Sequence, residues 1–241
     1  MNPYQQIIQQ RHINYLVHFT KSSNLPFILG DEEVQEKPAG IVSDDLLPQE
    51  IDRNDTKRND KHTNYVCCTV EFPNLKFQYW QKKHQEGNLF NEWAFLYIDP
   101  KIIDDTTLFS PINAATGNGI NLECGPDAFE HLFDQKINYY KVTNYKAGNK
   151  DEDEDEKKRM RSMELIRPAG LPSCYTSDIQ AEVLIKNKIP KEYIKKIQFP
   201  QNTYNYEITR LNLCHIDLST IKVNSFNENE MWGLEKQWRK D

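Results

Sequence analysis

The apolar residues of this chain occur in short runs that are bounded by polar residues, prolines and glycines. The runs at 65–72, 93–99 and 183–185 are rich in β-branched and aromatic residues, as buried strands are. A helical pattern at 125–133 lies between two of them, but strands and helices do not alternate regularly along the chain. Such a mixture of short strands and helices predicts an α+β fold.

Weaker patterns predict the remaining elements. A short polar helix opens the chain, and Ser22 or Ser23 is placed to cap a helix that Gly30 ends. Residues 31–63 are polar and are predicted to be mostly loop, and a loop of this length in a compact domain is often functional. The other predicted segments are strands at 13–20 and 194–200, and helices at 75–83 and around Met231, Trp232 and Trp238.

Length and composition indicate one soluble globular domain over residues 1–241. With 38% hydrophobic and 11% aromatic residues, the chain can bury a substantial core without disulfides or metal ions. The formal net charge of -6 argues against a nonspecific nucleic-acid coat protein. A basic cleft can still exist on an acidic chain, so the charge does not exclude a nucleic-acid substrate.

The cysteines and the N-terminus indicate where such a protein works. The five cysteines form no CxxC pair with metal-ligand spacing, and we interpret them as reduced core thiols. No metal cofactor is therefore expected. The N-terminus lacks a basic region followed by an apolar one, and no run approaches the ~18 apolar residues of a membrane helix. These features predict a cytoplasmic protein that does not bind membranes.

One segment stands apart by its charge. Residues 151–161 contain six consecutive acidic residues followed by a basic cluster. Such blocks are usually solvated, and we expect a mobile charged segment near 146–162. It does not divide the chain into two domains, because neither side has the composition of an independent core.

Polar residues of types that often bind ligands or catalyse reactions lie at or next to three predicted strands. They are His18 and Thr20 at the end of the first strand, Arg58 before the second, and Glu182 at the head of the run 183–185. Each has a plain structural explanation: a hydrogen-bonded core histidine, a loop cation paired with an aspartate, and a solvated strand end. Taken singly, none of these residues favours a functional role over its structural explanation.

The sequence lacks the motifs of several common enzyme classes. It contains no GxGxxG after a strand, no GxxxxGK[ST] loop, no HExxH and no GxSxG elbow. A carboxylate, an arginine and a histidine can jointly act on a dinucleotide, since an arginine fork suits pyrophosphate and a carboxylate stabilises an oxocarbenium-like sugar. This chemistry is compatible with the residues but is not unique to them.

Five motifs in order resemble the DarT family of nucleic-acid ADP-ribosyltransferases. The segment NDTKRNDKHTNYVCCTVEFPN contains the NDxxRxD pattern, a strand and an FPN turn. The other four motifs are INYLVHFTKSSNLPFIL, WAFLYIDPKII, TLFSPINAATGNG and SDIQAEVLIKNKIP, so that the resemblance covers most of residues 13–190. It implies an ADP-ribosyltransferase fold, in which two small twisted sheets with surrounding helices form a cleft for NAD. It also implies that NAD is a co-substrate, whose ADP-ribose is transferred to a base in single-stranded nucleic acid while nicotinamide is released.

The resemblance assigns roles to individual residues around NAD. His18 and Thr20 would contact the nicotinamide-side ribose and amide, and Asn24 would help to hold NAD. Arg58 would contact the phosphates or the reacting base. Glu182 would be the catalytic glutamate, orienting the ribose and favouring the oxocarbenium-like transition state.

Other positions have less certain roles. Asn54, Asp55 and Asp60 would shape the loop around the arginine of NDxxRxD. The segment 172–178 occupies the place of the family's substrate-recognition loop, in which Tyr175 would stack on a base and Ser177 or Asp178 would bond its edge. An ordinary surface loop with an incidental tyrosine remains an equal alternative.

A second possible substrate contact lies in the charged segment. Its basic residues would track phosphates, although the neighbouring acidic run would weaken their field. They are Lys157, Lys158, Arg159 and Arg161.

Partners and alternatives remain open at this point. DNA is favoured as the polymer and RNA is possible. Family members are often toxins with an antitoxin partner, frequently one that carries a macrodomain, and they serve toxin-antitoxin or anti-phage systems. The alternatives are a protein ADP-ribosyltransferase, an NAD glycohydrolase, or a catalytically silent binding module in which Glu182 and Arg58 form a structural pair.

Overall fold

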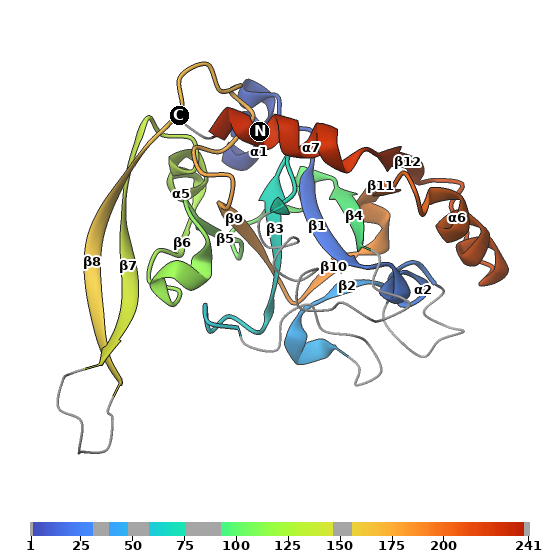
Figure 1. Ribbon diagram of the computed structural model, residues 1–241, viewed down its shortest axis with the longest axis horizontal. Coiled ribbons are helices and arrows are strands. Elements are labelled where there is room, and N and C mark those ends of the chain that lie inside the picture. The colour runs from blue at the N-terminus through green and yellow to red at the C-terminus, as the bar shows by residue number, and fades with distance from the viewer. Residues whose placement is uncertain (1, 31–38, 48–57, 76–92, 147–155, 239–241) are drawn as a thin grey trace.

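An eight-stranded sheet forms the centre of the computed structural model, which describes residues 2–30, 39–47, 58–75, 93–146 and 156–238 (Figure 1). The strand order is β12-β11-β4-β1-β3-β9-β5-β6. The strands are β1 Leu16–Lys21, β3 Tyr65–Val70, β4 Trp93–Ile98, β5 Leu108–Ser110, β6 Glu123–Cys124, β9 Glu182–Lys186, β11 Ile194–Pro200 and β12 Lys222–Phe226. Two separate pairs are β2 Gly40–Val42 with β10 Lys188–Pro190, and β7 Lys136–Lys146 with β8 Glu156–Ile166.

Helices cover both faces of the sheet. They are α1 Pro3–Arg11, α2 Leu25–Leu29, α5 Pro126–His131, α6 Tyr204–Leu213 and α7 Glu228–Glu235. The first four contribute buried apolar residues to the larger core, whereas α7 and the following 3-10 turn η6 Lys236–Trp238 pack against the smaller core on the other face. None of the helices within the described residues is both long and apolar enough to span a bilayer.

Strand β4 explains why the sheet lies inside the molecule. All six of its residues are buried, and they alternate between the two cores: Leu96 belongs to the larger one and Phe95 to the smaller one. A strand that is apolar on both faces must be covered on both sides. β1 and β11 flank it with antiparallel pairing, and Phe226 of β12 packs on Phe95 with ring centroids 4.8 Å apart.

Strand β3 joins two halves of the sheet and opens a gap between them. Residues 65–68 pair with β9, whereas 69–70 pair with the first two residues of β1. Residues 18–21 of β1 pair with β4 alone among the described strands. The two halves therefore diverge, and the ring of His18 spans the gap, with its Nδ1 2.8 Å from the carbonyl oxygen of Cys67.

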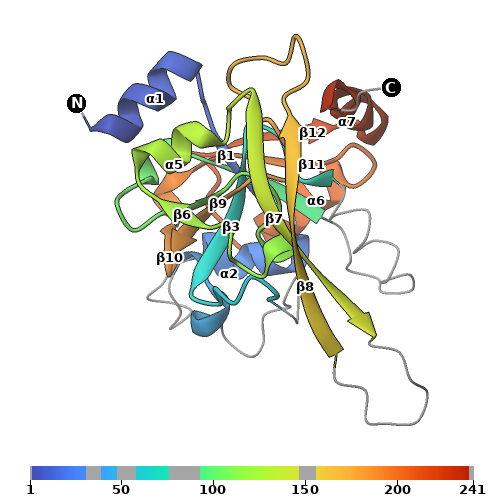
Figure 2. The same ribbon diagram turned by 90° about the vertical axis from the view of Figure 1, so that its left-hand side faces the viewer.

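The β7–β8 hairpin extends away from the sheet. Figures 1 and 2 show it projecting as a two-stranded ribbon from the side of the molecule that carries α5 and β6. The buried side chain of Ile137 anchors its base. Along the edge of β7, the Asn121 side chain accepts from the Tyr140 N–H and donates to the Tyr140 carbonyl, both at 2.8 Å.

The structure confirms the predicted α+β class and most of the predicted elements. The strands expected at 13–20, 65–72, 93–99, 183–185 and 194–200 are β1, β3, β4, β9 and β11, and the helix expected at 125–133 is α5. Within the segment expected to be mostly loop, residues 40–42 form β2. Of the helix expected at 75–83, all but Leu75 lies outside the described residues.

Three expectations need comment. The predicted cap is wrong, because Ser22 and Ser23 form part of a 3-10 turn and α2 has no side-chain cap. The interpretation of all cysteines as core thiols is wrong for Cys124 and Cys214, which are exposed. In the charged segment, residues 156–162 belong to β8, which the sequence did not predict; 147–155 lie outside the described residues, and the mobility stays a prediction.

Candidate active site

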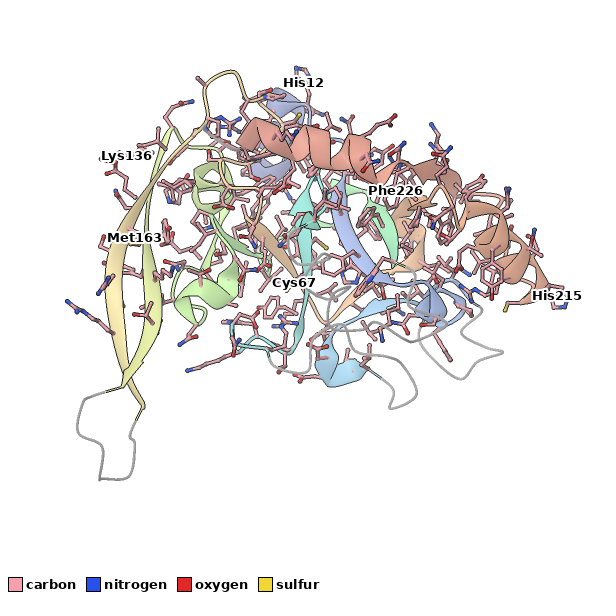
Figure 3. All side chains as sticks on the ribbon, in the orientation of Figure 1. His12, Cys67, Lys136, Met163, His215 and Phe226 are labelled. Carbon is pink, nitrogen blue, oxygen red and sulfur yellow. The ribbon has the colours of Figure 1, made fainter. Side chains whose placement is uncertain are left out.

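A cavity of about 200 Å³ opens where the two halves of the sheet diverge. All of the residues predicted to bind NAD or catalyse its cleavage line this one cavity: His18, Thr20, Asn24, Arg58 and Glu182. They come from β1, the turn after it, the loop before β3, and the start of β9. Figure 3 places Cys67, another lining residue, on β3 near the middle of the molecule.

Glu182 is fixed by two hydrogen bonds. As the first residue of β9, it pairs with Ser110 of β5. Its Oε1 accepts from Asn113 Nδ2 and its Oε2 accepts from the Ala114 N–H, both at 2.9 Å. Both donors are neutral, so these bonds orient the carboxylate without placing a cation against it.

Burial raises the pKa of Glu182 from its ordinary value of 4.5 to about 7. The Ala114 hydrogen bond opposes this rise in pKa, whereas the negative charge of Asp60 adds to it. Charged forms lose solvation when they leave water, which favours the protonated acid. Near neutral pH the group therefore exists in both protonation states.

A single turn connects Glu182 with the loop of Arg58. Asn113 caps the 3-10 turn η4 Ala114–Gly117: its Oδ1 accepts from the Ala115 N–H at 3.1 Å, which directs its Nδ2 to Glu182. Further along, Gly119 has a φ of +84°, and a Cβ on it would lie 2.4 Å from the carbonyl oxygen of Asp60. Only glycine permits both the backbone conformation and this close approach.

Arg58 uses every one of its N–H groups within the protein. Nε and Nη2 bond the two oxygens of Asp60 at 2.9 and 2.7 Å, and Nη1 bonds Asp44 at 3.0 Å. The remaining donors reach the carbonyl oxygens of Tyr65 and His62 at 3.0 and 2.8 Å. A guanidinium has five donors, so all of them have partners.

The charge of Arg58 is therefore balanced before any ligand binds. Burial works against the guanidinium, but its hydrogen bonds with Asp60 and the charges of Asp60 and Asp44 hold its pKa above the ordinary range. Burial alone would raise the pKa of Asp60, but the hydrogen bonds and the charge of Arg58 lower it below its ordinary value. To bond a phosphate, Arg58 must release a present partner, and the more exposed carboxylate is that of Asp44. The predicted contact with NAD stays a prediction.

His18 is a neutral imidazole in this cavity. Burial lowers its pKa to about 4, the hydrogen bond to Cys67 opposes that change in pKa, and the charge of Arg58 adds to it. Because the Cys67 carbonyl can only accept, the proton lies on Nδ1, and Nε2 keeps a lone pair as an acceptor.

The segment after β1 is held from behind by α6. Asn24 Nδ2 donates to Thr20 Oγ1 at 3.1 Å, and both side chains are buried. Ser22 Oγ donates to Glu207 Oε1 at 2.8 Å, and Arg210 bonds both the same carboxylate and the Ser22 carbonyl. These contacts fix the cavity wall that carries Thr20 and Asn24.

The predicted substrate-binding residues do not line the cavity. Tyr175 stacks on Trp238 with ring centroids 4.8 Å apart. Ser177 is 2% exposed, donates to the Asp134 carbonyl at 2.7 Å and accepts from Arg167 at 3.1 Å. Asp178 Oδ1 accepts from the Gln180 N–H at 2.6 Å. Their roles in substrate binding stay predictions.

Sequence reasoning missed three residues that organise the site. Asn113 and Asp44 hold Glu182 and Arg58, and the buried Arg167 donates to the carbonyls of Tyr175 and Pro172, both at 2.7 Å. Asn113 lies in one of the motifs that resemble the DarT family, so a signal for it was present. Neither Asp44 nor Arg167 had one.

Two further expectations concern the same region. Asp60 does shape the arginine loop, through the contacts with Arg58 given above. Asn54 and Asp55 lie outside the described residues. Within the described part of the chain, no group of three or more histidine, cysteine, aspartate and glutamate side chains is arranged to hold a metal ion.

Comparison with known proteins identifies the family. Residues 17–225 match the family model described as ssDNA thymidine ADP-ribosyltransferase, DarT. No curated protein sequence matches the chain significantly. Three similar solved structures are of Thermus sp. 2.9 DarT, and each match covers 96% of that chain. The complex with NAD+ has a TM-score of 0.52 and 12% identity over 89% of this chain, and the complex with ADP-ribosylated ssDNA has a TM-score of 0.52 and 12% identity over 90% of this chain. The complex with carba-NAD+ has a TM-score of 0.50 and 11% identity over 90% of this chain. The structural likeness confirms the predicted fold. Because the family match spans most of the sequence, this chain belongs to the DarT family of ADP-ribosyltransferase enzymes.

Proposed function

We propose that this enzyme transfers ADP-ribose from NAD to a thymine base in single-stranded DNA. The observation that carries the proposal is the convergence of Glu182, Arg58 and His18 on one cavity, in a chain that matches the DarT family over residues 17–225. The chemistry of the three groups suits a dinucleotide: one carboxylate near its ionisation midpoint, one cation and one neutral acceptor.

The reaction exchanges one glycosidic bond for another. The bond between the ribose carbon and the nicotinamide nitrogen breaks, and its electron pair leaves with neutral nicotinamide. A bond forms between the same ribose carbon and the base, which gives up a proton. Positive charge builds up on the ribose in between, and a carboxylate placed beside it lowers the barrier.

Glu182 is suited to both parts of this exchange. In its ionised form it accepts hydrogen bonds from ribose hydroxyls and stabilises the oxocarbenium-like transition state. With a pKa of about 7, it is also able to take up the proton that the base releases. The two hydrogen bonds from Asn113 and Ala114 hold the carboxylate in place, so little reorganisation is needed during the reaction.

His18 and Arg58 bind and do not exchange protons in this proposal. A neutral His18 offers Nε2 to a ribose hydroxyl or to the carboxamide N–H of nicotinamide. Arg58 takes up a phosphate oxygen in exchange for Asp44, keeping its bidentate contact with Asp60 as the fixed support. Thr20 and Asn24 complete the wall on the side of β1.

The biological setting follows from the product. An ADP-ribose group on a base prevents normal pairing, so unrestrained activity would be toxic to the cell that makes the enzyme. We propose that the protein acts as a toxin with a neutralising partner, in a toxin-antitoxin or anti-phage system. A macrodomain that removes ADP-ribose fits the partner's task. RNA is the second candidate polymer, because the residues described around the cavity include none that identifiably reads a 2′-hydroxyl.

Mass spectrometry of oligonucleotides tests the proposal directly. Purified protein is incubated with NAD and one DNA or RNA homopolymer, in a separate reaction for each homopolymer. The expected product is a thymine-containing DNA strand heavier by one ADP-ribose. Glu182→Ala should lower the rate by about 100-fold or more, whereas the control Glu192→Ala, at an exposed position that does not line the cavity, should not.

The other outcomes separate the alternatives. Consumption of NAD without any adduct would identify an NAD glycohydrolase, and adducts on protein alone would identify a protein ADP-ribosyltransferase. Binding of NAD without consumption would leave a silent binding module. The ion pair between Glu182 and Arg58 that such a module would contain is not among the contacts of the described residues, since each group is bonded to other partners.

A further inference from the structure

The β7–β8 hairpin has two chemically different faces. In an antiparallel ladder, directly opposite residues project to the same side, and successive pairs alternate between the sides. The register pairs Tyr139 with Met163, Lys141 with Arg161, and Thr143 with Arg159. These three pairs therefore share one face, named here the basic face.

The basic face concentrates positive charge without compensation. Lys141, Arg159 and Arg161 are exposed, and none of the residues that share their face between 137 and 143 or between 159 and 165 is acidic. Lys141 and Arg161 lie directly opposite each other. Like charges in this arrangement repel and destabilise the pairing of the strands. An anion bound between them would remove that cost.

The other face of the hairpin is neutral between residues 136 and 142 and between residues 160 and 166. Lys136 forms an ion pair with Glu164 at 2.5 Å, and the neighbouring side chains on this face are uncharged. Two faces of one ribbon thus differ in charge although they share the same backbone and the same solvent. General solubility does not require such a difference.

The hairpin is tied to the element that holds the catalytic glutamate. Asn121 bonds both backbone groups of Tyr140, the residue before Lys141. Asn121 lies four residues after the 3-10 turn η4, at whose start the Asn113 side chain and the Ala114 N–H hold Glu182. The hairpin is thereby connected to the wall of the cavity that carries Glu182.

We propose that the basic face binds the phosphate backbone of single-stranded DNA outside the catalytic cavity. The proposal rests on the proposed function in taking such a strand as the substrate. Lys141, Arg161 and Arg159 contact successive phosphates, and Tyr139 on the same face offers an aromatic surface for a base. The hairpin thereby lengthens the binding site and holds the strand while one base is modified.

Steady-state kinetics with two lengths of DNA test this surface. The substrates are thymine-containing strands of about 5 and about 20 nucleotides, since single-strand sites span about 4 to 16 nucleotides. The variant is Lys141→Gln with Arg161→Gln. The control, Lys101→Gln with Lys136→Gln, removes the same charge from exposed positions elsewhere, one of them on the neutral face. Neither pair touches the cavity.

The expected result is specific to the long strand. The variant should raise KM for the long strand several-fold and leave kcat and the short strand unchanged. Each lost phosphate contact lowers the slope of log affinity against log salt by about 0.7, so the double variant should lower it by about 1.4. Equal KM and equal salt slopes for the variant and the control would overturn the proposal.

Fluorescence anisotropy with a labelled strand separates this proposal from the proposed function. It measures binding and needs no catalysis. If the wild type modifies no DNA but binds the long strand through Lys141 and Arg161, the surface stands and the proposed reaction fails. If the wild type modifies DNA and both double variants bind it equally, the reaction stands and the surface fails.

Discussion

Replacement of Glu182 by glutamine should change the pH dependence of stability. The pKa of this group is raised by burial from 4.5 in water to about 7 in the folded protein. Between these two pH values the folded state binds more protons at Glu182 than the unfolded state does. The free energy of unfolding of the wild type therefore falls as pH rises through this window. A glutamine in the same place does not titrate.

The magnitude follows from the displacement of the pKa. One pKa unit corresponds to about 1.4 kcal/mol, so a fully ionised Glu182 costs the folded state about 3 kcal/mol. Between about pH 5 and about pH 8, the variant should gain about 2.5 kcal/mol relative to the wild type. Glutamine can accept only one of the two hydrogen bonds from Asn113 and Ala114, which lowers its stability by about 1 kcal/mol at every pH. That loss shifts the curve but does not alter its slope.

Urea denaturation of both proteins across this pH range measures the difference. Other titrating groups contribute equally to the two proteins, so their effects cancel when the variant is compared with the wild type. Glu192→Gln, at an exposed position, serves as the control and should give a flat difference. A flat difference for Glu182→Gln as well would show that its carboxylate titrates normally, and the argument for a desolvated catalytic carboxylate would fail.

Three further substitutions test the supports of the site. Gly119→Ala should destabilise the protein by about 2 to 3 kcal/mol in thermal unfolding, more than Gly170→Ala, which has a similar positive φ but nothing within 4 Å; equal losses would remove the argument from close approach. Arg167→Met should cost about 3 kcal/mol, because it removes the hydrogen bonds of a buried guanidinium to the carbonyls of Tyr175 and Pro172, and limited proteolysis should cut at 171–177; a resistant loop would contradict this. Arg58→Lys should weaken NAD binding about tenfold in calorimetry, since lysine lacks the planar fork; unchanged affinity would exclude a phosphate contact.

The strands could be predicted from sequence because their signal is local. Runs such as 93–98 are apolar on both faces, and only a central strand buries them in so short a length. The local pattern around Glu182 was explained equally well by a solvated strand end, and only the resemblance to the DarT family predicted a catalytic role for it. The structure places Glu182 at the head of β9, on the wall of the cavity.

The supports of the site could not be predicted in the same way. Asp44 and Arg58 are 14 residues apart, and Ser177, which Arg167 bonds, donates to the carbonyl of Asp134, 43 residues earlier in the chain. Nothing in the local pattern of a polar residue reveals which distant donor or acceptor it meets. The hairpin itself was missed because a ribbon that is exposed on both faces has little apolar periodicity to detect.

The balance of charge around the cavity explains why NAD is a suitable occupant. Among the described residues that line the cavity, Asp44 and Asp60 together outweigh Arg58, His18 is neutral, and Glu182 is partly ionised because burial raises its pKa to about 7. These residues give the cavity no net positive charge, and the nicotinamide ring of NAD carries one positive charge. During cleavage that charge leaves the ring and moves to the ribose, while nicotinamide departs uncharged. In the proposed reaction the fixed carboxylate of Glu182 lies beside the ribose and stabilises the charge in its new position more than in its old one, which is the condition for catalysis and not merely for binding.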